Sequence, residues 1–270
     1  GSISKDFAPH AMKAGAVVID NSSAFRMDPE VPLVVPEVNP QAILKHKGII
    51  ANPNCSTIIM VMALKPIYDL AKIKRVIVST YQAVSGAGKE GIDELDAQVR
   101  EHSEGREMTA NILPSASAEK HYPIAFNLIP QIDVFCDNLY TKEEMKMVNE
   151  TKKIMEDYEM RITATTIRVP VYRSHSESVN IELEKEVDLG AMREALAKFP
   201  GVTVQDDPSK QEYPMPLYTS EKDDVYVGRL RRDESCEKSY NIWVVGDQIR
   251  KGAALNTLQI AETMIKNGWI

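Results

Sequence analysis

The chain has 270 residues, of which 43% are hydrophobic and 26% are charged, as is ordinary for a globular protein. Its net charge of −7 argues against a nucleic-acid-binding face, which would need clustered lysine and arginine. No apolar run approaches the roughly 18 residues of a membrane span, and we find no signal peptide before the first predicted strand. We therefore expect a cytoplasmic protein of one large or two modest domains, with no nucleic-acid or membrane partner.

The three cysteines, Cys55, Cys136 and Cys236, are few, odd in number and widely spaced. They form neither a disulfide framework nor the CxxC pairs of a zinc site, so we expect reduced thiols and no bound metal. Cys136 and Cys236 have no local setting that would activate a thiol, and we interpret both as structural or incidental.

The first part of the chain predicts short helices and strands. A helix over residues 6–14 precedes an apolar strand at 16–20, of the kind that is buried in parallel sheets. Residues 32–36 and 48–51 predict further short strands, because each is bounded by proline, glycine or asparagine. A helix with an apolar stripe is expected at 56–70.

The middle of the chain is richer in strands. Residues 74–84 predict a strand exposed on one face, residues 89–102 an amphipathic helix, and residues 103–120 a surface excursion. A capping box at 141–144 opens a helix that ends near residue 157. The other expected elements are strands at 162–172, 178–184, 202–205, 225–231 and 241–245, and helices at 188–199 and 252–266. A parallel α/β beginning followed by a strand-rich middle predicts two domains.

Cys55 lies between a buried-strand pattern and a helix pattern. Pro53 and its neighbouring asparagines turn the chain, which places Cys55 at or just before the first helical turn, among free backbone N–H groups and the positive end of the helix dipole. Both favour a thiolate, so we expect an unusually acidic and nucleophilic Cys55. The same N–H groups can stabilise an oxyanion. The alternative is a small buried hydrophobic residue.

Of the five histidines, only His175 lies where polar groups concentrate at the junction of two predicted strands; the others lie among charged residues in loops or on helices. A histidine here can transfer protons near neutral pH, and Arg168 can hold a carboxylate. Because the two are seven residues apart, they face opposite sides of a regular strand. They converge only if Pro170 or the turn at 173–174 breaks the alternation. The alternative is a hairpin end with surface charges.

Taken together, these segments resemble the bacterial aspartate-semialdehyde dehydrogenases. The similar motifs occur in order at residues 20–27, 54–57, 80–88, 168–179 and 245–248, and the resemblance covers essentially the whole chain. It implies an α/β unit with a partial Rossmann-like parallel sheet, and an α+β catalytic and dimerisation domain with a mixed sheet. Residues 1–54 and 246–270 would form the remainder of the dinucleotide-binding domain, and residues 55–245 the other domain.

The resemblance also implies a role for each matching residue. Cys55 would be the nucleophile and His175 the general acid/base. Glu143 would bind the substrate ammonium and Arg168 its α-carboxylate. Because Glu143 lies three residues before Lys146, the alternative for these two residues is an ordinary surface ion pair. The full implied set is substrate binding by Gln82, Glu143 and Arg168, phosphate binding by Arg26, Asn54 and Lys146, and cofactor contacts from Ser2, Ser85, Gly86 and Gln248.

The implied reaction is the NADPH-dependent reductive dephosphorylation of L-aspartyl-4-phosphate to L-aspartate-4-semialdehyde through a thioacyl enzyme, on the route to lysine, threonine, methionine and diaminopimelate. The implied assembly is a homodimer, with a tetramer as the alternative.

The chain departs from the family pattern in one respect. The family's glycine-rich dinucleotide loop does not occur before Asp20, so we expect the chain to be part of a longer enzyme, with weakened cofactor binding by these residues alone. Two other functions stay open. One is a related acyl-phosphate reductase such as N-acetyl-glutamyl-phosphate reductase, which needs no acid like Glu143 because its substrate lacks a free ammonium. The other is a non-catalytic fragment that dimerises or binds anions.

Overall fold

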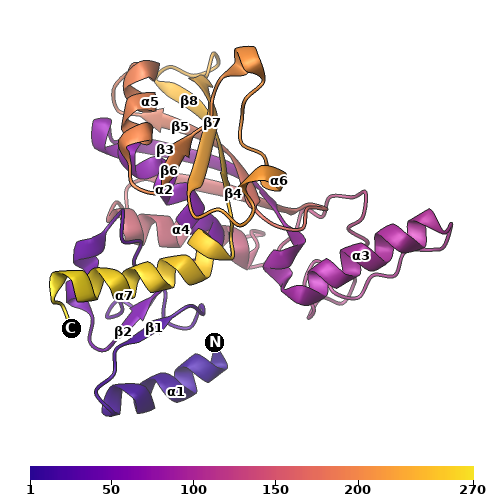
Figure 1. Ribbon diagram of the computed structural model, residues 1–270, viewed down its shortest axis with the longest axis horizontal. Helices are drawn as coiled ribbons and strands as arrows, with labels where there is room; N and C mark the ends of the chain where they lie inside the picture. Colours follow the sequence, from indigo (N-terminus) through magenta and orange to yellow (C-terminus); the bar gives the residue numbers. More distant parts are fainter.

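The computed structural model describes all 270 residues, which form two β-sheets of very different size (Figure 1). The smaller sheet pairs β1 (Val18–Asp20) with β2 (Ile49–Ala51) in parallel. The larger sheet is mixed and has the strand order β4-β3-β5-β8-β7-β6. The predicted combination of a short parallel sheet with a mixed sheet is confirmed.

Three helical segments surround the small sheet: α1 (Ser2–Lys13), the 3-10 helix η1 (Pro40–Lys45) and α7 (Leu255–Asn267). Figure 1 shows α7, in yellow, beside β1 and β2, although the two lie at opposite ends of the sequence. α7 is held beside the small sheet because its Ile260 and Met264 pack in one cluster with Val34, Ile43 and Ile50. None of the helices combines the length and the apolar character that crossing a membrane requires.

The prediction of a strand at residues 32–36 is wrong. This segment makes only one isolated bridge, between Leu33 and Ala51. Pro32 and Pro36 lack the backbone N–H that a strand ladder needs, so the pairing cannot extend in either direction. The other short strands of this region occur near their predicted positions.

The large sheet brings three strand ends to one edge. Its strands are β3 (Ile73–Gln82), β4 (Arg161–Arg168), β5 (His175–Leu183), β6 (Val202–Val204), β7 (Val225–Arg232) and β8 (Ser239–Gly246). β3 is parallel to β4 and antiparallel to β5. The last residues of β3 and β4 therefore lie beside the first residue of β5.

Helices α2 (Cys55–Leu70), α4 (Lys142–Met155) and α5 (Leu189–Lys198) share the main core with this sheet. α2 is buried almost all round between Ser56 and Ile67, and not along one stripe as predicted, because α4 and α5 also pack against it. The predicted capping box opens α4: the Thr141 hydroxyl accepts the Glu144 N–H, and the Glu144 carboxylate accepts the Thr141 N–H.

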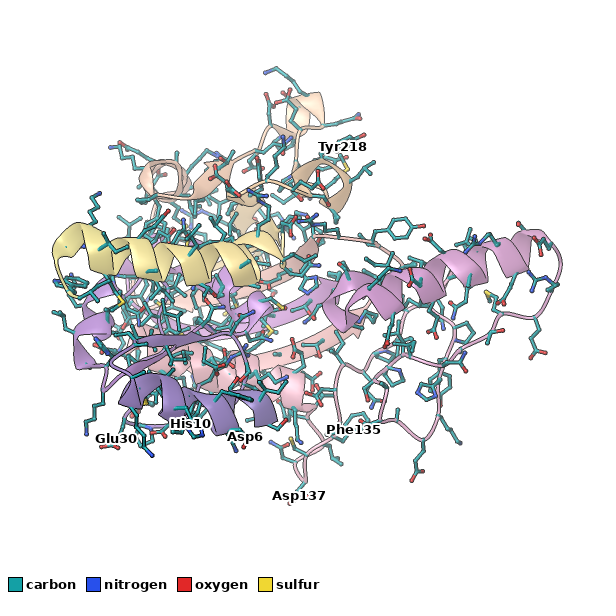
Figure 2. All side chains as sticks on the ribbon, turned by 60° about the horizontal axis from the view of Figure 1, so that its bottom comes forward. Asp6, His10, Glu30, Phe135, Asp137 and Tyr218 are labelled. Atoms are coloured by element: carbon teal, nitrogen blue, oxygen red, sulfur yellow. The ribbon has the colours of Figure 1, made fainter.

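An arm projects from this body. It consists of α3 (Lys89–Ser103) and the irregular segment that follows it, and Figure 2 shows α3 extending well away from the rest of the chain. Leu95 of α3 packs with Leu113, Ile124 and Ile129 of that segment. The predicted amphipathic helix and surface excursion are confirmed. The remaining short elements are η2 (Val84–Ala87), η3 (Pro208–Lys210), α6 (Pro216–Thr219) and the π-helix η4 (Arg250–Ala254).

Candidate active site

The edge of the mixed sheet brings together Gln82, Arg168 and His175. Gln82 ends β3 and pairs with Arg168, which ends β4, while His175 begins the neighbouring β5. The strand alternation between Arg168 and His175 is broken, because β4 stops at Arg168 and Ser174 has a left-handed φ of 70°. The sequence analysis required such a break for the side chains of Arg168 and His175 to converge.

Gly86 marks the point where they meet. A Cβ added to Gly86 would lie 2.6 Å from Nη1 of Arg168 and 3.4 Å from Nε2 of His175. Both side chains are buried, with only 3% of Arg168 and none of His175 exposed. The structure therefore places a predicted cofactor residue against the predicted carboxylate-binding and acid/base residues.

The N-terminus of α2 carries Cys55, as predicted, but most of its amides are occupied. Oδ1 of Asn54, the N-cap, accepts the N–H groups of Ser56 and Thr57 at 3.1 and 3.3 Å. The expectation that these amides stabilise an oxyanion is therefore wrong for Ser56 and Thr57. The amide of Cys55 itself is the first-turn N–H that the cap leaves free.

The pKa of Cys55 departs from the expectation. The residue is partly exposed, yet burial of its thiol and the nearby Glu143 carboxylate raise its pKa to about 12, against opposing effects from Arg26 and the Ser56 amide. The prediction of an unusually acidic thiol is thus wrong for the ligand-free protein. The helix end acts only over one turn, whereas desolvation and a buried carboxylate both disfavour the thiolate.

This pKa predicts the pH dependence of Cys55 alkylation. Because the thiolate is the reactive form, ligand-free Cys55 should react with iodoacetamide more slowly than the exposed Cys236 at pH 7. Its rate should rise about tenfold per pH unit up to about pH 11, since each unit below the pKa lowers the thiolate fraction tenfold. Peptide mapping after timed labelling measures both rates. Faster labelling of Cys55 than of Cys236 at pH 7 would contradict the raised pKa.

Glu143 connects the turn directly before Cys55 with the end of β3 through hydrogen bonds. Its Oε1 accepts Nδ2 of Asn54 at 3.0 Å and Nε2 of Gln82 at 3.4 Å, and its Oε2 binds Lys146 at 3.1 Å. Glu143 is only 5% exposed, so this is not an ordinary surface ion pair. Burial lowers the pKa of Lys146, but Glu143 and Asp133 more than offset it and the net pKa is raised, which keeps the ammonium charged.

Arg26 presents guanidinium donors near Cys55. Its Nε donates to the Asn52 carbonyl at 2.9 Å, its Nη2 to the Asn21 carbonyl at 3.0 Å, and its Nη1 to Glu150 at 3.4 Å. Of the five N–H groups of a guanidinium, two are left for a ligand. Arg26 and Lys146 are cationic side chains that can bind a phosphate group, and in the ligand-free protein both pair with carboxylates.

His175 is held in one orientation by the backbone. The Ala83 N–H donates to its Nδ1 at 3.0 Å, so a neutral ring carries its proton on Nε2, which is buried without a protein partner. Burial and, next, the Arg168 charge lower the pKa of His175 well below 6.5, so the ring is neutral at pH 7. His175 therefore offers an N–H donor to a ligand.

Arg168 is also incompletely satisfied. Its Nη1 donates to the Ala83 carbonyl at 2.6 Å, while its Nε is buried without a partner. Native proteins rarely leave buried donors without acceptors. The free donors of Arg168 and His175 indicate a ligand that carries carboxylate or carbonyl oxygen.

The predicted cofactor residues do not all lie together. Nε2 of Gln248 donates to the Ser85 hydroxyl, and its Oε1 accepts the Ser174 N–H at 2.9 Å, beside His175. These two residues and Gly86 form one group. Ser2 begins α1, which lies beside the smaller sheet. It is exposed and makes no hydrogen bond with that group.

The sequence analysis missed two residues that surround Cys55. A Cβ added to Gly252, in the π-helix before α7, would lie 3.0 Å from Cβ of Cys55. Glu150 accepts the Asn54 N–H at 2.6 Å through Oε2. A signal for Glu150 was present, because it lies seven residues after Glu143 and thus on the same face of the predicted helix.

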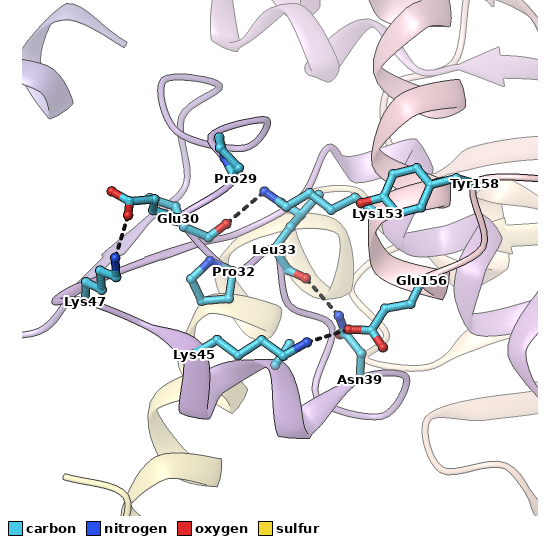
Figure 3. A pocket seen from close by; sticks show the side chains of 12 residues that line it. Pro29, Glu30, Pro32, Leu33, Asn39, Lys45, Lys47, Lys153, Glu156 and Tyr158 are labelled. Atoms are coloured by element: carbon cyan, nitrogen blue, oxygen red, sulfur yellow. Dashed lines mark hydrogen bonds and ion pairs between the residues drawn. The ribbon is translucent and has the colours of Figure 1, made fainter.

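A separate hollow of about 450 Å³ contains none of the predicted residues. Figure 3 shows it between the segment that carries Glu30 and the end of α4. Its exposed lysines are neutralised, since Lys45 pairs with Glu156 at 2.7 Å and Lys47 pairs with Glu30. The chemistry of the side chains, and not the size of a hollow, locates the active site.

Comparisons with known proteins identify the family of this chain. Two family descriptions match, "Semialdehyde dehydrogenase, NAD binding domain" over residues 1–46 and "Semialdehyde dehydrogenase, dimerisation domain" over residues 64–251. Aspartate-semialdehyde dehydrogenases of Aquifex aeolicus and Bacillus subtilis are 56% and 53% identical, over 100% and 98% of this chain and 78% and 77% of theirs. The structure of aspartate semialdehyde dehydrogenase II from Vibrio cholerae, complexed with ASA, superposes with a TM-score of 0.92 at 47% identity, over 98% of this chain and 77% of that one. The chain therefore belongs to the aspartate-semialdehyde dehydrogenase family.

Proposed function

We propose that the gene product that carries this chain reduces L-aspartyl-4-phosphate to L-aspartate-4-semialdehyde with release of phosphate. The observation that carries the proposal is the buried Glu143, which links the turn before Cys55 to Lys146. A carboxylate that can pair with the ammonium of an amino acid therefore lies beside the Cys55 turn and beside a lysine that can pair with phosphate. The Vibrio cholerae relative, solved with ASA, supports the same class of ligand.

Substrate binding divides between two ends of the site. At one end Arg168, through its free Nε, binds the α-carboxylate, while Glu143 binds the ammonium and Gln82 positions the chain between them. At the other end Arg26 and Lys146 bind the phosphate, together with the Asn54 amide group, which has one N–H beyond its bond to Glu143.

The first half of the reaction transfers the acyl group to Cys55. The sulfur bonds to the acyl carbon, and the bond from that carbon to the phosphate oxygen breaks, with its electron pair leaving on phosphate. The thiol proton goes to the departing phosphate, because Nδ1 of His175 is occupied by the Ala83 amide and Nε2 already carries hydrogen. The products are a thioester and hydrogen phosphate.

Three groups assist this step. The substrate ammonium, once paired with Glu143, offsets the effect by which this carboxylate raises the pKa of Cys55. The Nε2–H of His175 and the Cys55 amide donate to the acyl oxygen as negative charge develops on it. His175 thus acts as a hydrogen-bond donor during acylation and not as the base for the thiol.

The second half releases the semialdehyde. When bound, the nicotinamide supplies a hydride to the acyl carbon of the thioester. His175 holds the oxyanion again as the bond from carbon to the Cys55 sulfur breaks, and one solvent proton restores the thiol.

We propose NADP(H) as the cofactor, with contacts from Ser2, Ser85, Gly86 and Gln248. Gly86 lets the backbone approach Arg168 and His175 closely, because a Cβ at this position would lie only 2.6 Å from Nη1 of Arg168. Ser85 and Gln248 add a hydroxyl and an amide beside Gly86. The match of residues 1–46 to an NAD-binding domain supports binding of a nicotinamide dinucleotide.

We also propose the division into domains and the assembly. Residues 1–54 and 246–270 belong to a dinucleotide-binding domain, which the shared cluster of Ile50 with Ile260 and Met264 supports. Residues 55–245 form the catalytic domain. The match to a dimerisation domain supports a homodimer, either alone or within a tetramer.

The test compares two acyl phosphates. With aspartyl phosphate, Glu143→Gln should lower kcat/KM about 10²-fold, because loss of one partner of a buried charge pair costs about 2–5 kcal/mol. Steady-state oxidation of NADPH measures this. Glu156→Gln, an exposed change at the end of the same helix, is the matched control and should have little effect. Preference for N-acetyl-glutamyl phosphate, or an unaffected Glu143→Gln variant, would contradict the proposal.

A further inference from the structure

Glu150 binds two parts of the site that come from different regions of the chain. Its Oε2 accepts the N–H of Asn54, directly before Cys55, at 2.6 Å, and its Oε1 accepts Nη1 of Arg26 at 3.4 Å. Only 1% of Glu150 is exposed. A single buried carboxylate therefore lies between the guanidinium and the turn that carries the sulfur.

The two contacts differ in strength. The 2.6 Å bond to Asn54 is short for an N–H donor, as expected when the acceptor is charged. The 3.4 Å contact with Arg26 is long, so this pair acts mainly through charge and leaves the second N–H of Nη1 for an anion. The pKa of Glu150 is raised above its usual value, chiefly by burial, although Arg26 and the Asn54 amide favour the ionised form and partly offset this effect.

The same helix holds the backbone around Arg26. Nζ of Lys153 donates to the carbonyl oxygens of Arg26, Asp28 and Val31, at 2.8, 2.7 and 2.8 Å. Figure 3 shows Lys153 reaching from α4 toward the neighbouring segment at Pro29 to Leu33. Lys153 thus holds the segment that carries Arg26, and Glu150 links the Arg26 guanidinium to the turn that carries Cys55.

These residues form one stripe on α4. Glu143, Lys146, Glu150 and Lys153 are spaced by three, four and three residues, which places them on one face of the helix. The first two have proposed ligand-binding roles that the mechanism uses. The second two bind no ligand there, yet they contact the parts that do.

We propose that Glu150 is a positioning residue that fixes the phosphate-binding Arg26 relative to Cys55, with Lys153 anchoring the same segment. The inference rests on the proposed roles of Arg26 and Cys55. It applies to the phosphate end of the site, because Glu150 bonds to Asn54 and Arg26 and makes no hydrogen bond with Arg168 or His175 at the other end.

The test uses the phosphorylating direction, in which inorganic phosphate and the semialdehyde can be varied separately. Glu150→Gln keeps an oxygen for the Asn54 amide but removes the charge that faces Arg26. We expect the KM for phosphate to rise about tenfold, as for loss of a hydrogen bond to a charged group, while the KM for the semialdehyde changes less than about twofold. Glu156→Gln is the control on the same helix.

Each outcome decides the inference. An unchanged KM for phosphate, or equal increases in both KM values, would overturn it, since a merely structural role does not single out phosphate. If Glu150→Gln does not fold, Lys153→Gln replaces it, with the same selective rise expected and an unchanged KM for phosphate again overturning the inference. Failure of the proposed function is distinguishable, because the wild-type protein would then show no phosphate-dependent oxidation of the semialdehyde.

Discussion

A Cys55→Ser variant is expected to lose at least about 10⁴-fold in kcat for reduction of aspartyl phosphate. A serine hydroxyl is far less acidic than a thiol and finds no base here. Nδ1 of His175 already accepts the Ala83 amide, and the carboxylate of Glu143 is bonded to Asn54, Gln82 and Lys146. Steady-state NADPH oxidation measures the loss.

Two controls accompany this variant. Cys236→Ser changes an exposed cysteine in a loop and should retain wild-type activity. The thermal unfolding midpoint of Cys55→Ser should stay close to that of the wild type, because serine is no larger than cysteine and Gly252 still fits against its Cβ. Activity of Cys55→Ser within tenfold of the wild type would contradict a covalent role for the thiol.

Replacing His175 with alanine should lower kcat by about 10²–10³-fold, the cost of losing one oxyanion donor. His175→Gln should lose less, because its side-chain amide can still donate an N–H. If His175 were instead the base for the thiol, glutamine would be no better than alanine. The comparison of the two variants therefore separates a donor from a base.

The pH profile provides a second readout for the same residue. Burial and Arg168 lower the pKa of His175 well below 6.5, so the neutral ring persists as the pH falls from 8 to 6.5 and gains a proton only at lower pH. Wild-type kcat should therefore show no step that His175→Gln abolishes within this interval. A step near pH 6.5 that disappears in the variant would contradict the neutral ring.

The sequence predicted the parts of the site that depend on local structure. Asn54 and Pro53 indicated the start of a helix at Cys55, and the helix begins there with Asn54 as its cap. The capping box at Thr141 predicted α4, and hence the shared face of Glu143 and Lys146. These features follow from residues within one turn of each other, so a sequence contains the information needed.

The parts that depend on distant residues were not predicted. The pKa of Cys55 is raised by burial and by Glu143, which belongs to another helix, while only the effects of the local helix end were visible in the sequence. The convergence of Arg168 with His175 required the register of β3 with two neighbours and the left-handed Ser174. The role of Glu150 required knowing that α4 lies against the Cys55 turn.

The strand predicted at residues 32–36 failed for a different reason. Its apolar residues are buried as expected, since Leu33, Val34 and Val35 are at most 2% exposed. Burial alone does not make a strand, however, and the flanking Pro32 and Pro36 remove the donors that pairing would use. The hydrophobic pattern predicted the environment of this segment correctly and its backbone pairing incorrectly.

Detection of the thioacyl enzyme tests the nucleophilic role of Cys55 most directly. The protein is mixed with aspartyl phosphate in the absence of NADPH, quenched in acid, digested and examined by mass spectrometry. We predict an aspartyl group on the peptide that contains Cys55, removable by hydroxylamine and absent from the Cys55→Ser variant. An unmodified Cys55 in a protein that turns over, or an aspartyl group on another residue, would contradict the claim that Cys55 carries the acyl group.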